Sequence, residues 1–218
     1  MARTLLLDLD GTLVDTLPDL AAALNRLMGR RGLPAFSPQH VAAMVGDGLA
    51  VLVARAFAAH GRQADPAAVA EMSADYAAHV AVESTLFPDV LPVLTILARQ
   101  GWRLAVCTNK PEQAARHLLQ VMGLLPLLSA VGGGDSFPAR KPDPSHLLGT
   151  LGQAGGQVSA AVMLGDHHND VLAARGAGIP SIFAAWGYGA IAMADGSAVA
   201  RDVTEAAAIA NRILPDAG

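Results

Sequence analysis

In Thr4-Leu5-Leu6-Leu7-Asp8-Leu9-Asp10-Gly11-Thr12 a short apolar run ends abruptly in two acids and a glycine. Residues two apart in a strand point to the same side, so a strand that ends at Asp8 can present Asp8 and Asp10 together. Gly11 permits the sharp turn that would follow and a close approach to an anion. Ligands of open α/β sheets bind beyond the carboxyl ends of the strands. This stretch therefore predicts the first strand of such a sheet, with its acids at the ligand-binding edge.

Composition and charge fit a globular protein that acts on small molecules. Of 218 residues, 52% are hydrophobic and 16% are charged, which favours a packed core. A net charge of −4 without basic runs gives no attraction to nucleic acid or to an anionic membrane. The single cysteine, Cys107, requires no oxidising compartment, and no apolar run is long enough to span a bilayer. We expect a cytoplasmic protein with a small-molecule partner, and leave its oligomeric state open.

Five short apolar segments are each followed by a polar or glycine-containing turn and then a helix-like segment. This alternation predicts an α/β fold, a Rossmann-like doubly wound parallel sheet covered by helices. The predicted strands are residues 4–8, 103–107, 128–131, 161–164 and 181–184.

The interval between the first two predicted strands is far longer than one crossover helix needs. It contains alanine- and leucine-rich helical patterns at 17–31, 48–60 and 66–82. We predict a small α-helical cap domain at residues 17–86, inserted into a catalytic core formed by 1–16 and 87–218. The hinges are expected near 15–18 and 84–88.

Polar groups follow two of the later strands. Thr108 and Asn109 follow the second strand and begin a helix, where free amides can bind an anion, although an ordinary helix cap explains them equally well. Lys141 precedes Pro142, which holds the lysine backbone extended. Because Lys110 is the only other lysine of the chain, a specific role for Lys141 is favoured over a solvated surface position.

Two more acids, Asp166 and Asp170, end another buried strand and lie four residues apart. A turn into a helix can bring both carboxylates to one side. Neighbouring carboxylates repel unless a cation lies between them, and hard oxygen ligands favour a magnesium-like ion. Asn169 also fits a helix cap. For His167 and His168, turn residues at a pocket rim are favoured over metal ligands, because imidazole prefers softer metals.

Together these motifs resemble the four ordered motifs of the haloacid dehalogenase-like superfamily, and the resemblance covers nearly the whole chain. The helical insertion resembles the small cap domain of that family. The motifs are Asp8-Leu9-Asp10-Gly11-Thr12, Thr108-Asn109, Lys141-Pro142 and Gly165-Asp166 with Asp170.

The resemblance implies a magnesium-dependent phosphatase that forms a covalent aspartyl-phosphate. Asp8 would be the nucleophile and Asp10 the general acid and base, assisted by Lys141. The phosphate would be bound by Thr108, Asn109, Lys141 and the backbone at Gly11. Mg²⁺ would be held by Asp8, Asp166 and the Asp10 carbonyl, with Asp170 as a supporting acid.

The turn Val45-Gly46-Asp47-Gly48-Leu49, followed by Arg55, resembles the phosphoglycolate phosphatase branch of the family. It predicts 2-phosphoglycolate as the substrate, with Arg55 as the partner of its carboxylate. An ordinary turn between helices and a solvated Arg55 explain the same residues.

Two other functions remain open at this point. A sugar-phosphate mutase of the β-phosphoglucomutase type keeps Asp10 but returns the phosphoryl group to its product. A non-enzymatic phospho-accepting signalling domain shares the aspartates, threonine and lysine, but its acceptor lies on a later strand and it has no counterpart of the cap. Turnover of free phosphate esters separates a phosphatase from both.

Overall fold

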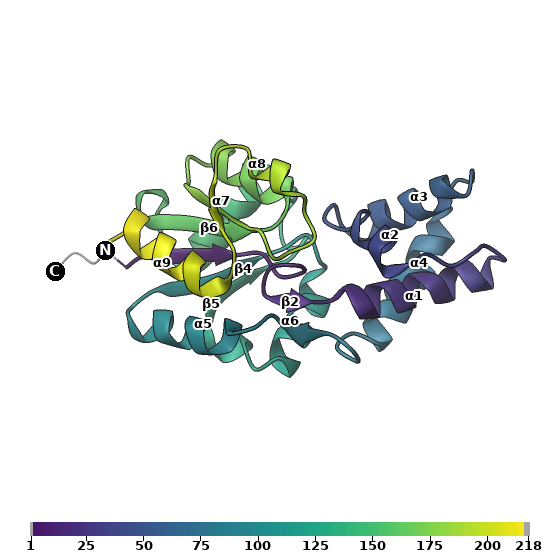
Figure 1. The fold of residues 1–218 in the computed structure, drawn as a ribbon, viewed down its shortest axis with the longest axis horizontal. Helices are drawn as coiled ribbons and strands as arrows, with labels where there is room; N and C mark the ends of the chain where they lie inside the picture. Colours follow the sequence, from purple (N-terminus) through teal and green to yellow (C-terminus); the bar gives the residue numbers. More distant parts are fainter. Residues whose placement is uncertain (1, 216–218) are drawn as a thin grey trace.

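The computed structural model describes residues 2–215, in which six parallel strands form one sheet flanked by helices (Figure 1). The strand order is β5-β4-β1-β6-β7-β8. The chain therefore runs outward from β1 to β5, then returns to the other side of β1 and continues to β8. This reversal leaves a switch point between the two neighbours of β1, where a crevice opens at the carboxyl ends. The prediction of a doubly wound α/β fold is confirmed. The strands are β1 (Thr4–Leu7), β4 (Arg103–Cys107), β5 (Leu128–Gly132), β6 (Ala161–Gly165), β7 (Ser181–Ala184) and β8 (Ala198–Ala200).

Side chains of β1 alternate between two apolar layers. Leu5 and Leu7 join the larger buried cluster, whereas Leu6 packs in a separate cluster with residues of α7 and α8. Figure 1 shows α7 and α8 on one side of the sheet and α5 and α9 on the other. β1 is buried on both faces, which explains its uninterrupted run of leucines. The helices of this part are α5 (Val90–Arg99), α6 (Glu112–Val121), α7 (Pro144–Gln153), α8 (His168–Gly176) and α9 (Val203–Ile213), with short 3₁₀ turns η1 (Leu125–Leu127), η2 (Val158–Ala160) and η3 (Ile191–Ala194).

Four helices form a group beyond the sheet, on the right of Figure 1. They are α1 (Leu17–Arg30), α2 (Pro38–Ala42), α3 (Leu49–Ala59) and α4 (Pro66–Ala78). We call the segment that holds them, residues 17–84, the insertion. It leaves the core at β2 (Val14–Asp15) and returns at β3 (Thr85–Leu86), and these two short strands pair antiparallel. The predicted domain limits stay a prediction.

The two connections of the insertion are held together by one buried carboxylate. Asp19 accepts hydrogen bonds from the backbone amides of Val82, Glu83 and Ser84 at 2.9–3.0 Å, and from the Ser84 hydroxyl at 2.6 Å. Although burial opposes its charge, these donors hold the pKa of Asp19 below its ordinary value. The acid therefore fixes where the insertion leaves the core and where it returns.

The structure differs from the sequence prediction at several short elements and one helix cap. The predicted strands did not include the two-residue β2 and β3 or the three-residue Ala-Val-Ala edge strand β8, and the predicted helices did not include the five-residue α2. The side chain of His167, rather than Asn169, caps α8. Within residues 2–215 no helix is long and apolar enough to cross a bilayer.

Candidate active site

Three buried carboxylates meet where two neighbouring strands end. Asp8 directly follows β1 and Asp166 directly follows β6, and these strands pair in parallel register. Asp170 comes from the first turn of α8. Ligand oxygens of the three lie within 4.8 Å of one another. The fold thus assembles a cluster of oxygen ligands from acids distant in sequence.

Lys141 is the cation inside this cluster. Its Nζ lies 2.8 Å from Asp8 Oδ1 and donates to Asp170 Oδ1 at 2.6 Å, with the lysine side chain only 2% exposed. Burial opposes its charge, but the carboxylates of Asp170 and Asp8 raise the pKa of Lys141 above its ordinary value. A permanently charged ammonium therefore lies against the predicted nucleophile.

The three carboxylates and one ammonium leave an excess of two negative charges. Burial raises the pKa of Asp8 in spite of Lys141, and burial together with the charges of Asp8 and Asp170 raises the pKa of Asp166. A divalent cation with oxygen ligands fits this donor set, since it offsets the excess charge that burial disfavours.

Asp166 is held in place by three donors. Its Oδ1 accepts from the Thr12 hydroxyl at 2.9 Å, and its Oδ2 accepts from the amides of Tyr188 at 2.8 Å and Gly189 at 3.4 Å. Gly11 has a φ of +84°, and a Cβ there would lie 2.4 Å from Asp166 Oδ2. Gly11 is therefore needed both for the turn and for the close approach of the backbone to this acid.

Asp10 has a different partner, Lys110, which the sequence analysis did not place in the site. The Lys110 ammonium donates to Asp10 Oδ1 at 2.9 Å and to the Tyr76 hydroxyl at 2.6 Å. Burial opposes the charge of Lys110, but the neighbouring Asp10 and Tyr76 raise its pKa above the ordinary value. Burial raises the pKa of Tyr76 to about 12, so this hydroxyl stays protonated. Because Tyr76 belongs to α4, the contact joins the insertion to the core.

Thr108 and Asn109 follow β4, as predicted from the sequence, and both are buried. The Thr108 hydroxyl accepts from the Lys110 amide at 3.2 Å. Asn109 Nδ2 donates to the carbonyl oxygens of Lys141 at 3.0 Å and Gly46 at 3.2 Å. Asn109 Oδ1 is buried without a partner in residues 2–215, which leaves one acceptor of this side chain at the site unused.

A cavity of about 620 Å³ lies between the core and the insertion. The core side contributes Asp8, Asp10 and Lys110, together with Thr108 and Asn109. The facing wall of the insertion is largely apolar, including Leu49, Leu52 and Val80, with Tyr76 as a polar member. A molecule in this cavity would present one end to Asp8, Asp10 and Lys110, and the other to the apolar side chains of the insertion.

Arg55 is not among the residues that line this cavity. Its guanidinium donates to the Met44 carbonyl at 2.9 Å and to Asp47 Oδ2 at 2.5 Å, and 41% of the side chain is exposed. The contact between Arg55 and substrate stays a prediction that would require this pairing to break. Lys110 is instead a cation at the cavity wall, and the scarcity of lysine that singled out Lys141 applied equally to it.

Comparisons with known proteins agree with this geometry. A family model described as haloacid dehalogenase-like hydrolase matches residues 5–184. A phosphoglycolate phosphatase of Caulobacter vibrioides is 44% identical over 189 residues, covering 85% of this chain and 80% of the relative. Another, of Rhodospirillum rubrum, is 41% identical over 196 residues, covering 86% and 81%. The crystal structure of a predicted phosphoglycolate phosphatase from Haemophilus somnus superposes with a TM-score of 0.87 at 30% identity, covering 95% of this chain and 97% of that chain.

Proposed function

The chain belongs to the haloacid dehalogenase-like hydrolase family, and we propose that it hydrolyses 2-phosphoglycolate through a covalent aspartyl-phosphate on Asp8. The observation that supports this proposal most is that Asp8 and Asp10 both line one cavity and that each has a lysine ammonium against it. Lys141 lies against Asp8, and Lys110 lies against Asp10. A phosphate ester with a second negative charge matches the two ammonium groups.

The chemistry divides between Asp8 and Asp10. In the first step a carboxylate oxygen of Asp8 attacks phosphorus while the bond to the leaving oxygen breaks, and that oxygen takes a proton from Asp10. In the second step Asp10 takes a proton from a water molecule, which attacks the phosphorus of the acyl-phosphate. Inorganic phosphate leaves and the Asp8 carboxylate is restored.

We propose Mg²⁺ as the divalent ion, held by Asp8, Asp166 and the backbone carbonyl of Asp10, with Asp170 in support. A bound Mg²⁺ supplies positive charge that offsets the phosphate and its transition state. Lys141 supplies fixed positive charge beside Asp8, and the Thr108 hydroxyl offers a donor to a phosphate oxygen. The Asn109 amide would bind the phosphate by giving up one of its hydrogen bonds to the Lys141 and Gly46 carbonyls. Thr12 and the amides beyond β7 keep Asp166 oriented.

The substrate carboxylate is assigned to Lys110 and Tyr76. An ammonium has three N–H donors, and Lys110 uses two of them on Asp10 and Tyr76, so one is left for the substrate. A neutral sugar would place hydroxyls against the apolar wall formed by Leu49 and Leu52, where they would lose hydrogen bonds. A short phosphorylated acid has no such groups.

The test is phosphate release by the purified protein from 2-phosphoglycolate and from glucose 6-phosphate, with and without a chelator. The proposal predicts a kcat/KM at least about tenfold higher for 2-phosphoglycolate, and activity that chelation removes and Mg²⁺ restores. Equal use of the sugar phosphate would contradict the substrate assignment. Isomerised sugar phosphate without net phosphate release would indicate a mutase.

The cytoplasmic location expected from the sequence also stays a prediction.

A further inference from the structure

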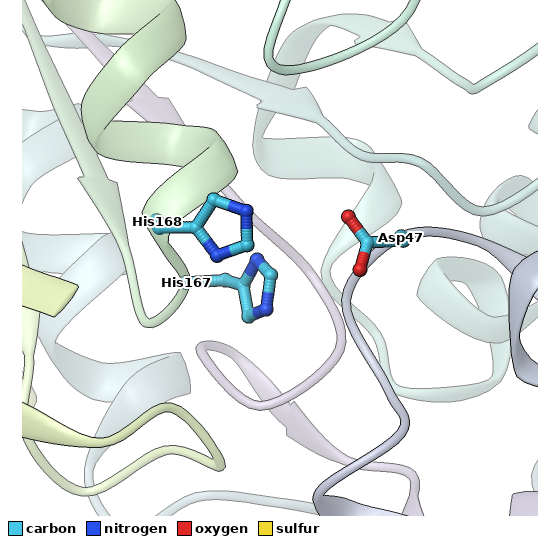
Figure 2. Close-up of side chains that lie close together, drawn as sticks. All are labelled: Asp47, His167 and His168. Atoms are coloured by element: carbon cyan, nitrogen blue, oxygen red, sulfur yellow. The ribbon is translucent and has the colours of Figure 1, made fainter. Parts of the chain in front are cut away.

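His167 and His168 lie beside the active site but take no part in the chemistry above. Figure 2 shows both imidazole rings at the start of α8, with the carboxylate of Asp47 facing them across a short gap. The ring centroids are 4.1 Å apart, and ligand atoms of all three side chains lie within 4.8 Å of one another. Asp47 belongs to the loop between α2 and α3, so the group joins the insertion to the core.

The loop that carries Asp47 is docked on His167. Gly46 has a φ of +120°, and a Cβ at this position would lie 2.6 Å from His167 Nε2. The Gly46 carbonyl accepts from Asn169 Nδ2 at 3.3 Å and from Asn109 Nδ2 at 3.2 Å. The glycine therefore allows the loop to approach the imidazole closely, and the two amides hold it there.

Each of the three side chains keeps a lone pair for a further partner. Asp47 accepts from Asn169 Nδ2 at 2.7 Å and from Arg55, but a carboxylate has about four acceptor sites. The His168 side chain makes no hydrogen bond within residues 2–215, so no hydrogen bond has to break when one of its ring nitrogens binds a metal ion. His167 Nδ1 accepts only a long 3.4 Å hydrogen bond from the Asn169 amide. Ligation through Nε2 would move the ring proton to Nδ1 at the loss of this contact.

From this geometry we propose that Asp47, His167 and His168 together bind a borderline transition-metal cation, with Zn²⁺ as the preferred ion. Because Asp47 belongs to the insertion and the histidines to the core, the bound ion would link the two parts. Two imidazoles and a carboxylate are typical ligands of Zn²⁺, and a water molecule takes the fourth position. Mg²⁺ prefers oxygen ligands instead. Zinc bonds of about 2.0–2.1 Å bring ligand atoms to within about 3.5 Å of one another. Rotation of the His168 ring would bring its ligand nitrogen closer to the ligand atoms of Asp47 and His167, from the observed spacing of up to 4.8 Å.

The test measures Zn²⁺ binding to the metal-stripped full chain by calorimetry, with excess Mg²⁺ present to occupy the carboxylate cluster of Asp8. Wild type should bind one Zn²⁺ under these conditions. His168→Gln should weaken that binding at least tenfold, and Asp47→Asn should weaken it as well. His79→Gln, which removes an exposed histidine at the end of α4, is the matched control and should bind as wild type does.

A second measurement separates loss of the site from a folding defect. Zn²⁺ should raise the melting temperature of wild type, because it binds only the assembled site. His168→Gln should keep the wild-type melting temperature and activity in Mg²⁺ alone, but lose the increase caused by Zn²⁺. Equal Zn²⁺ affinity in wild type and His168→Gln would overturn the proposal. So would Zn²⁺ binding that Mg²⁺ competes away, because the ion would then occupy the carboxylate cluster.

Discussion

The two buried lysines of the chain differ in the parts of the molecule that they contact. Lys141 contacts Asp8 and Asp170, all within the core, and its side chain is 2% exposed. Lys110 contacts Asp10 in the core and Tyr76 in the insertion, at the wall of the cavity. One ammonium is thus fixed whatever the position of the insertion, whereas the environment of the other depends on the insertion being closed.

This difference between the two lysines separates the phosphoryl-transfer chemistry from the recognition of the substrate. Charge beside the nucleophile is needed for every phosphate ester, so it belongs in the rigid core. Recognition of the rest of the substrate can depend on the insertion, because water must be excluded from the first step and admitted to the second. We therefore expect changes at Lys141 to affect all substrates alike, and changes at Lys110 or Tyr76 to alter the preference between substrates.

The largest effect is expected from Lys141→Met. Removing this ammonium leaves Asp8 and Asp170 buried without a counter-charge, which should destabilise the metal-free protein by about 3 kcal/mol or more. Activity on every phosphate ester should be lost. Denaturant unfolding and phosphate release would measure both effects. Wild-type stability and turnover in Lys141→Met would contradict the role of Lys141 as the counter-charge of Asp8 and Asp170.

Lys110→Met should act more selectively. Loss of a charge-assisted contact to the substrate carboxylate should lower kcat/KM for 2-phosphoglycolate by about 10- to 100-fold, and by less for a phosphate ester without a carboxylate. Tyr76→Phe is the milder companion, which keeps the ammonium but removes its hydroxyl partner, and should cost about fivefold. If Lys110→Met slows both substrates equally, Lys110 serves Asp10 and not the substrate.

The carboxylate cluster gives the core a stability that depends on pH and metal. Burial raises the pKa of Asp8 and of Asp166, so these two groups contribute most to the stability of the metal-free protein at acid pH, and their contribution falls as pH rises from about 4 through the raised pKa values. Divalent cations bind the ionised groups, so Mg²⁺ should raise the melting temperature more near pH 8 than near pH 5. Sodium chloride at equal ionic strength is the control. An increase of the same size at both pH values would contradict the assigned cluster.

Arg55→Ala should have the smallest effect of the series. Its guanidinium pairs with Asp47 at the surface of the insertion, so we expect kcat/KM for 2-phosphoglycolate to fall by no more than about twofold. A tenfold loss confined to 2-phosphoglycolate would instead support the sequence prediction that Arg55 binds the carboxylate. Measuring Arg55→Ala beside Lys110→Met would identify which cation recognises the acid.

The core could be predicted from the sequence because its site residues follow the ends of strands. Asp8 and Asp166 lie immediately after β1 and β6, and parallel pairing alone brings them together. The same reasoning found four motifs but missed β8, whose Ala-Val-Ala sequence is too short to show a pattern. The local sequence pattern therefore predicts the residues at the edge of the sheet, but it predicts little of how the insertion covers them.

The insertion was harder to predict in detail because helix packing decides which side chains reach the cavity. Periodicity identified the helix that contains Tyr76, but the direction of its hydroxyl depends on how α4 packs against α1 and α3. Arg55 was selected from its position after the Gly46-Asp47-Gly48 turn, and the structure pairs it with Asp47 instead. The cap of α8 by His167 depends on a side-chain nitrogen that residue preferences do not favour.

A phosphoryl group carried by Asp8 during turnover can be detected directly. The protein would be mixed with 2-phosphoglycolate and Mg²⁺, quenched with acid within the first turnover, digested and analysed by peptide mass spectrometry. We expect a phosphoryl group on the peptide that contains Asp8, and none in Asp8→Asn. That variant should fold but release no phosphate, because an amide cannot attack phosphorus. Turnover by Asp8→Asn at the wild-type rate, or a phosphoryl group on another residue, would contradict an aspartyl-phosphate on Asp8.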